Sequence, residues 1–240
     1  MGKILSILPL TIFFCSCSPK YSVEGNTAMS NMDGKMVFVK VYQDNKWLSV
    51  DSAEVIHGSF TIKGHTDSIV MANLYLDDQS IMPFVLENGK IKISLAFNEL
   101  SARGSNMNDR LYTFLDKKQE IENKLYELER SEARLILEGR DLDEVKAELS
   151  DTSSALNKEM TTLIKSFIID NGENVLGPYV FILLGTSLPY PILTPQIEEI
   201  INDAPYSLKN NHMVKEFIKT AKDNMELIKE QQRMNEGGGN

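Results

Sequence analysis

The chain has 240 residues, of which 42% are hydrophobic and 25% are charged, and its formal net charge is −9 at pH 7. This composition excludes an intrinsically disordered chain, and the length allows one large or two small hydrophobic cores. The negative charge disfavours contact with a phosphate backbone, so we expect no nucleic-acid partner.

The first sixteen residues have the pattern of a bacterial signal peptide. Lys3 carries the positive charge that precedes such segments, and residues 4–14 are almost unbroken apolar residues. A helix that spans a bilayer needs about 20 apolar residues, so this stretch is too short for a permanent anchor. We therefore expect a cleaved signal peptide over residues 1–16.

The residues around Cys17 resemble a lipobox, the cleavage motif of bacterial lipoproteins. Ser16 is the small residue that the motif requires, whereas the competing Cys15 follows the bulky Phe14. The resemblance implies cleavage before Cys17 and a diacylglyceryl thioether on that cysteine. Two or more acyl chains hold a protein stably on a membrane, so we expect a lipidated tether over residues 17–21.

Cys15 and Cys17 are the only cysteines of the chain, and Cys15 would be removed with the signal peptide. Lipidation of Cys17 would then remove the last thiol from the mature chain. The mature chain could then form no disulfide and use no thiol nucleophile. Residues 18–22 contain no acid, which favours the periplasmic side over surface export, and the absence of Asp at position 18 favours the outer membrane. We expect a lipid-anchored protein of a Gram-negative cell envelope.

Residues 22–106 have the pattern of an all-β domain. Short runs rich in β-branched and aromatic residues alternate with turn residues, and Asn88-Gly89 between two apolar runs predicts a β-hairpin. Strands of this length and spacing are typical of an antiparallel β-sandwich. The expected strands cover residues 37–42, 59–64, 69–76, 81–86 and 91–93.

Helical periodicity replaces strand alternation over residues 107–235. A helix that begins near Asn108 ends at Gly139, and Asp141 caps a second helix with Glu144 completing a capping box. Two long helices with a short break predict a helical hairpin. Shorter helices are expected over residues 177–184, 196–202 and 211–234, before a flexible tail over residues 236–240. The predicted fold class is therefore α+β, a β-sandwich followed by a helical hairpin and further helices.

Several segments of the β-domain resemble one known family. They are residues 21–25, 33–38, 50–55, 57–64 and 85–91. They are similar to the domain of unknown function that precedes thioredoxin-like domains in many envelope disulfide reductases. The resemblance implies a β-domain followed by helices. It does not imply reductase activity here, because the chain contains no Cys-x-x-Cys motif.

No residue pattern predicts catalysis, a cofactor or a metal. The histidines, His57, His65 and His212, have no ligands at metal-binding spacing nearby, and the first two are expected in exposed turns. Asp77-Asp78 lacks the alternating oxygen ligands of a calcium loop, which favours a turn, and Glu198-Glu199 is expected on a solvated face. Nucleophile-elbow, zinc-protease and phosphate-loop motifs are absent from the sequence.

These observations favour a non-catalytic accessory or binding module, with the helical hairpin docking another envelope protein. One alternative is a small-molecule or glycan-binding lipoprotein that uses the sheet near Trp47, the only tryptophan. Another is an accessory subunit to a separate thioredoxin-fold reductase. An apolar stripe exposed on the helices would favour the protein partner, and a cluster of exposed aromatic side chains on the sheet would favour the small ligand.

Overall fold

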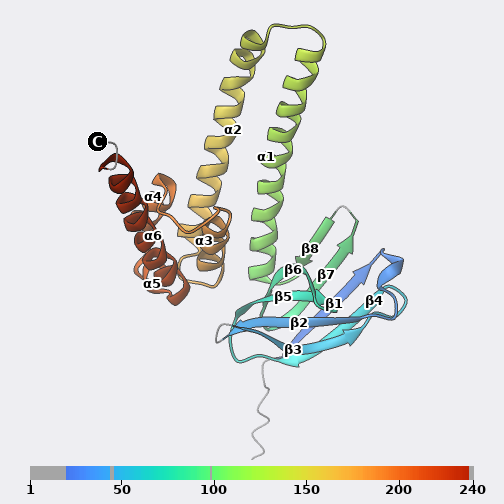
Figure 1. Cartoon of the computed structure of the whole chain (residues 1–240). Coiled ribbons are helices and arrows are strands. Elements are labelled where there is room, and N and C mark those ends of the chain that lie inside the picture. The colour runs from blue at the N-terminus through green and yellow to red at the C-terminus, as the bar shows by residue number, and fades with distance from the viewer. Residues whose placement is uncertain (1–19, 44–45, 98, 238–240) are drawn as a thin grey trace, which may run out of the picture.

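The structure, a computed structural model, describes residues 20–43, 46–97 and 99–237. A β-domain lies at one end, a long pair of helices projects from it, and shorter helices pack beside the base of this pair (Figure 1). The predicted order of strands first and helices second is confirmed. Within these residues, no helix combines the length and hydrophobicity that a bilayer crossing requires.

The strands form two four-stranded sheets that enclose one hydrophobic core. Alternate residues of each strand point into this core, where Val23, Val39, Ile62, Leu74 and Ile91 are fully buried. Sheet A has the order β4 (Ser59–His65), β1 (Lys20–Thr27), β7 (Gly89–Ala96) and β8 (Glu99–Arg103). Sheet B has the order β3 (Lys46–Glu54), β2 (Met36–Gln43), β5 (Val70–Leu76) and β6 (Gln79–Leu86).

Two details correct the predicted antiparallel sandwich. Strands β1 and β7 pair in parallel, from Tyr21 opposite Gly89 to Thr27 opposite Leu95. The whole of sheet B lies between these strands in the sequence, so no local turn signal could reveal their direction. The second correction concerns Asn88-Gly89, which joins sheet B to sheet A and closes no hairpin. Gly89 has a φ of +109°, but Asn88 lacks the positive φ that a type I′ hairpin turn requires.

Strand β1 also begins earlier than expected, within the predicted tether of residues 17–21. Lys20 and Tyr21 already pair with β4, opposite His65 and Gly64. Tyr21 is 4% exposed, and its hydroxyl donates a hydrogen bond across the core to Asp51 of β3, with 3.1 Å between the oxygens. Tyr21 therefore belongs to the folded domain, because its ring fills the space between the sheets. Cys17 lies outside the described residues.

The predicted helical hairpin is confirmed. Helix α1 spans Asn106–Leu137 and helix α2 spans Leu142–Asp170, and the two run side by side (Figure 1). Gly139, with a φ of +88°, ends the first helix, and the Asp141 carboxylate accepts hydrogen bonds from the amides of Asp143 and Glu144. These bonds form the Asp141 half of the predicted capping box, and the Glu144 carboxylate lies 4.0 Å from the Arg140 guanidinium.

Four shorter elements complete the helical region. They are α3 (Leu176–Thr186), α4 (Pro195–Asp203), α5 (Tyr206–Asn210) and α6 (His212–Gly237). Thr194 caps α4 as predicted, its hydroxyl oxygen accepting the Ile197 amide at 3.3 Å. Helix α5 has no counterpart in the predicted elements, and α6 extends two residues into the expected tail. A second apolar cluster, which includes Ile168, Phe181 and Ile200, holds these helices against α2.

The first turns of α1 close the edge of sheet B. Asn108 is fully buried, and its side chain accepts the Val85 amide at 2.8 Å and donates to the Val85 carbonyl at 2.7 Å. One turn later, the Tyr112 hydroxyl donates to the Pro83 carbonyl at 2.7 Å. Strand β6 is an edge strand, so these bonds satisfy backbone groups that no neighbouring strand reaches. The helices are thereby joined directly to the β-domain.

Candidate ligand-binding surface

The outer face of sheet B carries an unusual concentration of aromatic side chains. Alternation along β2 buries Val37, Val39 and Val41 and turns Phe38, Lys40 and Tyr42 outward. The register then places further outward side chains on the neighbouring strands: Trp47 opposite Tyr42, Ser49 opposite Lys40, and Tyr75 opposite Phe38. We call these six residues, together with Asp77 and Asp78 of the β5–β6 turn, the Trp47 surface.

The aromatic rings of this surface contact one another. Trp47 lies 5.4 Å from Tyr42 and 5.8 Å from Tyr75, measured between ring centroids, in tilted and edge-on arrangements that aromatic pairs favour. Tyr75 is 9% exposed although it lies on an outer face. Trp47 and Tyr42 are 44% and 49% exposed, which leaves a large aromatic area open to solvent.

Lys40 lies at the centre of the Trp47 surface. Its ammonium is 4.2 Å from the centroid of the Tyr75 ring and 3.8 Å from a carboxylate oxygen of Asp78. Only 19% of the Lys40 side chain is exposed, whereas the Asp78 side chain is fully exposed. Lys40 thus occupies the position over the Tyr75 ring that an external cation would take.

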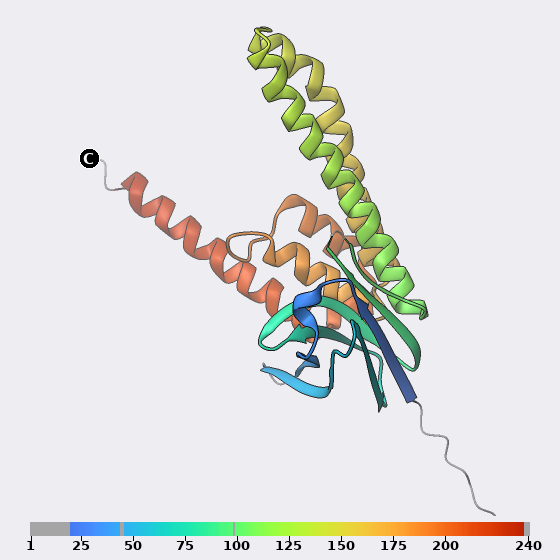
Figure 2. The ribbon, with the colours of Figure 1, turned by 90° about the vertical axis from the view of Figure 1, so that its right-hand side faces the viewer.

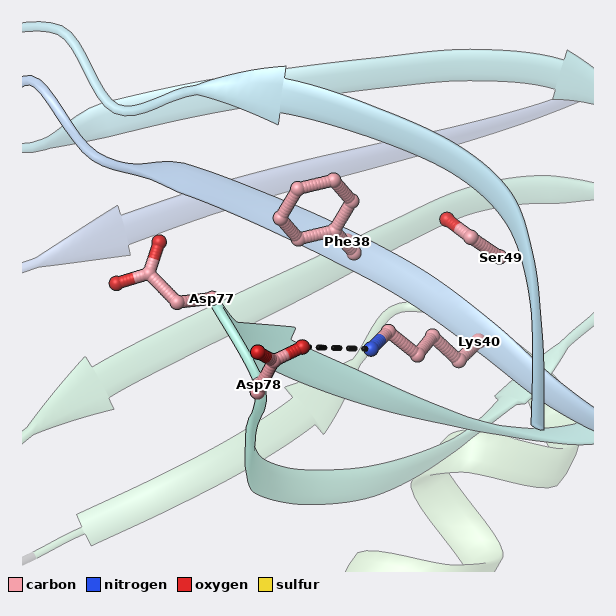
Figure 3. Close-up of a pocket in the computed structure, with 5 residues that line it drawn as sticks. All are labelled: Phe38, Lys40, Ser49, Asp77 and Asp78. Atoms are coloured by element: carbon pink, nitrogen blue, oxygen red, sulfur yellow. Dashed lines mark ion pairs between the residues drawn. The ribbon is translucent and has the colours of Figure 1, made fainter.

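A shallow cavity of about 370 Å³ opens here, lined by Phe38, Lys40, Ser49, Asp77 and Asp78. Figure 3 shows Ser49, Lys40 and the two aspartates arranged around the Phe38 ring. An apolar ring beside a hydroxyl, an ammonium and two carboxylates can contact the apolar face of a ligand and hydrogen-bond to its edge. Such a set of acidic and cationic side chains can bind a ligand without catalysing a reaction.

The structure brings one predicted site element, Asp77-Asp78, to the cavity beside Lys40 and leaves the others apart. Asp77 and Asp78 form the predicted turn, with Asp77 at a φ of +52°, and this turn lines the cavity. Glu198 and Glu199 are exposed, as expected for a solvated face. Glu199 and Asp203 of α4 both contact Lys165 of α2, and these hydrogen bonds raise the pKa of that lysine.

The histidines lie far from one another in the fold. His57 is exposed in the predicted turn, at a φ of +51°, beside Gly58. His65 is the last residue of β4, so the prediction of a turn was wrong there, and its ring nitrogen lies 2.7 Å from an Asp67 carboxylate oxygen. His212 begins α6, 3.6 Å from Glu216. Across the described ranges, no three His, Cys, Asp or Glu residues group as metal ligands would.

Five residues of the Trp47 surface were not singled out from the sequence, namely Phe38, Lys40, Tyr42, Ser49 and Tyr75. The alternation over residues 37–42 did contain a signal, since it assigns Phe38, Lys40 and Tyr42 to one face. Nothing local could show that Trp47 and Tyr75 share that face, because this depends on the strand order β3-β2-β5.

A known family resembles the β-domain. Residues 21–111 match the model of a family described as a domain of unknown function (DUF4369), and no curated protein matches the chain. The matched range covers nearly all of the β-domain and ends in α1 just after Asn108, which pairs with the edge of β6. Over residues 21–111, this chain is therefore similar to the family described as domain of unknown function (DUF4369).

Proposed function

We propose that this protein is a non-catalytic lipoprotein of the cell envelope, anchored through Cys17, whose β-domain binds a neutral, hydroxyl-rich ligand such as a glycan. The observation that carries the proposal is the Trp47 surface, in which the exposed rings of Trp47 and Tyr42 share one sheet face with Lys40, whose ammonium lies over the buried Tyr75 ring. The periplasmic face of the outer membrane is the location that the sequence around Cys17 favours.

The charges of the Trp47 surface argue for a neutral ligand. Lys40 already lies over the Tyr75 ring, which disfavours a cationic ligand, and Asp77 and Asp78 would repel an anionic one. A sugar ring has an apolar face that can stack on Trp47 or Tyr42. Its hydroxyl groups can donate to the aspartates and accept from Lys40 and Ser49.

The proposal can be tested by tryptophan fluorescence, because Trp47 is the only tryptophan and reports on this surface alone. The full mature chain is titrated with a panel of neutral mono- and oligosaccharides, and at least one should shift the emission saturably. Calorimetry then measures the affinity of the variants. Trp47→Ala and Asp78→Asn should each weaken binding about tenfold, the effect of losing one stacking or hydrogen-bond partner.

Tyr126→Ala is the matched control, since Tyr126 is an aromatic residue of α1 with 60% exposure, outside the Trp47 surface. This variant should bind like the wild type. If no sugar of the panel binds, or if Trp47→Ala and Asp78→Asn bind as well as the wild type, the glycan proposal is wrong.

A second candidate function, docking of an envelope protein, has support at the tip of the hairpin. Leu137 is 88% exposed there and Leu142 is 44% exposed. The tip lies far from the start of β1, as Figure 2 shows, and a helix of 32 residues is about 48 Å long. An exposed apolar stripe along the described shaft would have added support, but residues such as Leu125 and Leu128 are partly buried there.

Cross-linking in intact cells distinguishes this second function. A photoreactive residue at position 137 should capture one defined envelope protein, and Leu142→Asp should abolish the product. The same probe at exposed position 126 should capture none. Equal capture at both positions would contradict specific docking at the tip.

A further inference from the structure

We infer that the outer face of sheet A rests on the phosphate-bearing headgroups of the membrane to which the chain is anchored. This inference goes beyond ligand binding and rests on the proposed anchor at Cys17. It begins from an uneven distribution of charge, since this acidic chain carries a basic surface on one of its two sheets.

The register places the basic side chains together. Ser22 of β1 lies between Lys63 of β4 and Lys90 of β7, and Lys92 of β7 lies opposite Arg103 of β8. All belong to the outward set, because the alternate residues of these strands fill the core. Among the described residues of the four strands, the charged outward side chains are Lys20, Lys63, Lys90, Lys92 and Arg103 against Glu24 and Glu99.

The few acidic groups near this face leave part of its charge uncompensated. Glu24 accepts from Lys90 at 2.7 Å, Arg103 pairs with Asp116 of α1, and His65 pairs with Asp67. Lys63 and Lys92 are exposed, and within the described part of the chain no carboxylate lies at ion-pair distance from either. Two free ammonium groups thus lie on a face whose other charges largely cancel.

The position of the anchor brings this face to the bilayer. Lys20, the first residue of β1, follows Cys17 by three residues, and three residues span at most about 11 Å. The Debye length at physiological ionic strength is about 8 Å, so this tether holds the Lys20 end of sheet A at little more than one Debye length from the headgroups. Anionic headgroups attract nearby lysines by about 1 kcal/mol each.

This orientation leaves the Trp47 surface accessible. The two sheets pack with their inner faces together, so the outer face of sheet B points away from that of sheet A. Contact between sheet A and the headgroups would therefore turn Trp47 and Lys40 toward the periplasm. The acidic remainder of the molecule would be repelled from the same anionic surface, which favours one orientation over the reverse.

The test uses the mature chain, residues 17–240, whose single thiol at Cys17 can be coupled to a maleimide lipid in vesicles. Coupling fixes the anchor chemically, so the result does not depend on whether the cell lipidates Cys17. Vesicles of phosphatidylcholine alone are compared with vesicles containing one-third phosphatidylglycerol. An amine-reactive reagent labels the lysines, and mass spectrometry measures the labelling rate of each.

On anionic vesicles, Lys63 and Lys92 should be labelled about fivefold more slowly than on neutral vesicles, which corresponds to ~1 kcal/mol for each lysine. The protection should disappear at 0.5 M salt, and Lys215 and Lys219 of α6, exposed and on another element, should show no difference. The double variant Lys63→Glu/Lys92→Glu should lose the protection of Lys90 as well.

Equal labelling rates on both kinds of vesicle would overturn the inference. So would uniform protection that includes Lys215 and Lys219, because it would show general adsorption without a preferred face. Protection by a soluble anionic polysaccharide without protection by anionic vesicles would also overturn it, and would assign the basic face to a different partner.

Discussion

At the scale of single residues, Asn108 joins the helices to the β-domain. Its buried amide group satisfies both the N–H and the carbonyl of Val85 on the edge of β6. Asn108→Leu would leave these backbone groups buried and unpaired, so we expect the free energy of unfolding to fall by about 2–4 kcal/mol. Urea denaturation measures the change. Asn123→Ala, at an exposed position of the same helix, should change it by less than about 0.5 kcal/mol.

Tyr21 couples the stability of the core to alkaline pH. Burial, and then the neighbouring Asp51 carboxylate, raise the pKa of Tyr21 from 10.0 to about 12. The unfolded chain therefore releases this proton first, so the contribution of Tyr21 is complete below pH 10 and is lost as the pH rises toward 12.

Tyr21→Phe tests this coupling. At pH 7 the variant should be less stable than the wild type by about 1 kcal/mol, because it loses the hydrogen bond to Asp51. Between pH 10 and pH 12 the difference should shrink, since phenylalanine has no proton to lose. Urea midpoints at pH 7, 10 and 11 give the comparison, with Tyr126→Phe on exposed α1 as control. A constant difference at all three values would contradict the assignment.

At the scale of elements, the turn of the hairpin depends on Gly139. A side chain at this position would meet no atom within 4 Å, so only the φ of +88° resists substitution. Gly139→Ala should therefore destabilise the tip by about 1 kcal/mol, and Gly139→Asn by less, because asparagine tolerates left-handed backbone.

Hydrogen exchange measures this effect locally. Amides of residues 130–150 should exchange about fivefold faster in Gly139→Ala, the equivalent of that free energy. The amides of the β-domain should be unchanged, because α1 is hydrogen-bonded to the sheet through Asn108 and Tyr112 in its first turns, at the opposite end of the hairpin from the tip (Figure 1). Faster exchange throughout both regions would show that the hairpin and the β-domain unfold as one unit.

At the scale of the whole molecule, the proposed anchor at Cys17 would set where every other surface lies. Cys17→Ala should leave an unprocessed or soluble protein, because the thioether cannot form. Cys15→Ala should still be lipidated, since the proposed cleavage before Cys17 removes that cysteine. Metabolic labelling with a radioactive fatty acid follows both variants. Labelling that is lost in Cys15→Ala and kept in Cys17→Ala would show that cleavage occurs at the other cysteine.

Local patterns in the sequence determined the class of each half of the molecule. Alternation along β2 and the change to helical periodicity near Asn108 predicted strands and then helices, and Gly139 and Asp141 marked the turn of the hairpin. These signals are local because hydrogen bonds within a helix and side-chain alternation within a strand depend on near neighbours. The resemblance of the β-domain to a known family was confirmed. This resemblance is also a local signal, because turn and strand residues carry it.

The tertiary structure alone decided which distant residues meet. Asn88-Gly89 has the pattern of a hairpin turn, but it joins two different sheets. The preceding residue, Glu87, contacts the start of α1, where its carboxylate accepts the Met107 amide at 3.0 Å. The parallel pairing of β1 with β7 and the gathering of Phe38, Trp47 and Tyr75 likewise depend on strand order. By itself, then, the sequence predicted the resemblance to this family and all of the helices except α5, and the anchor at Cys17 stays a prediction. The Trp47 surface and the basic face of sheet A arise only when strands far apart in the chain become neighbours, because cross-strand partners have no fixed separation along it.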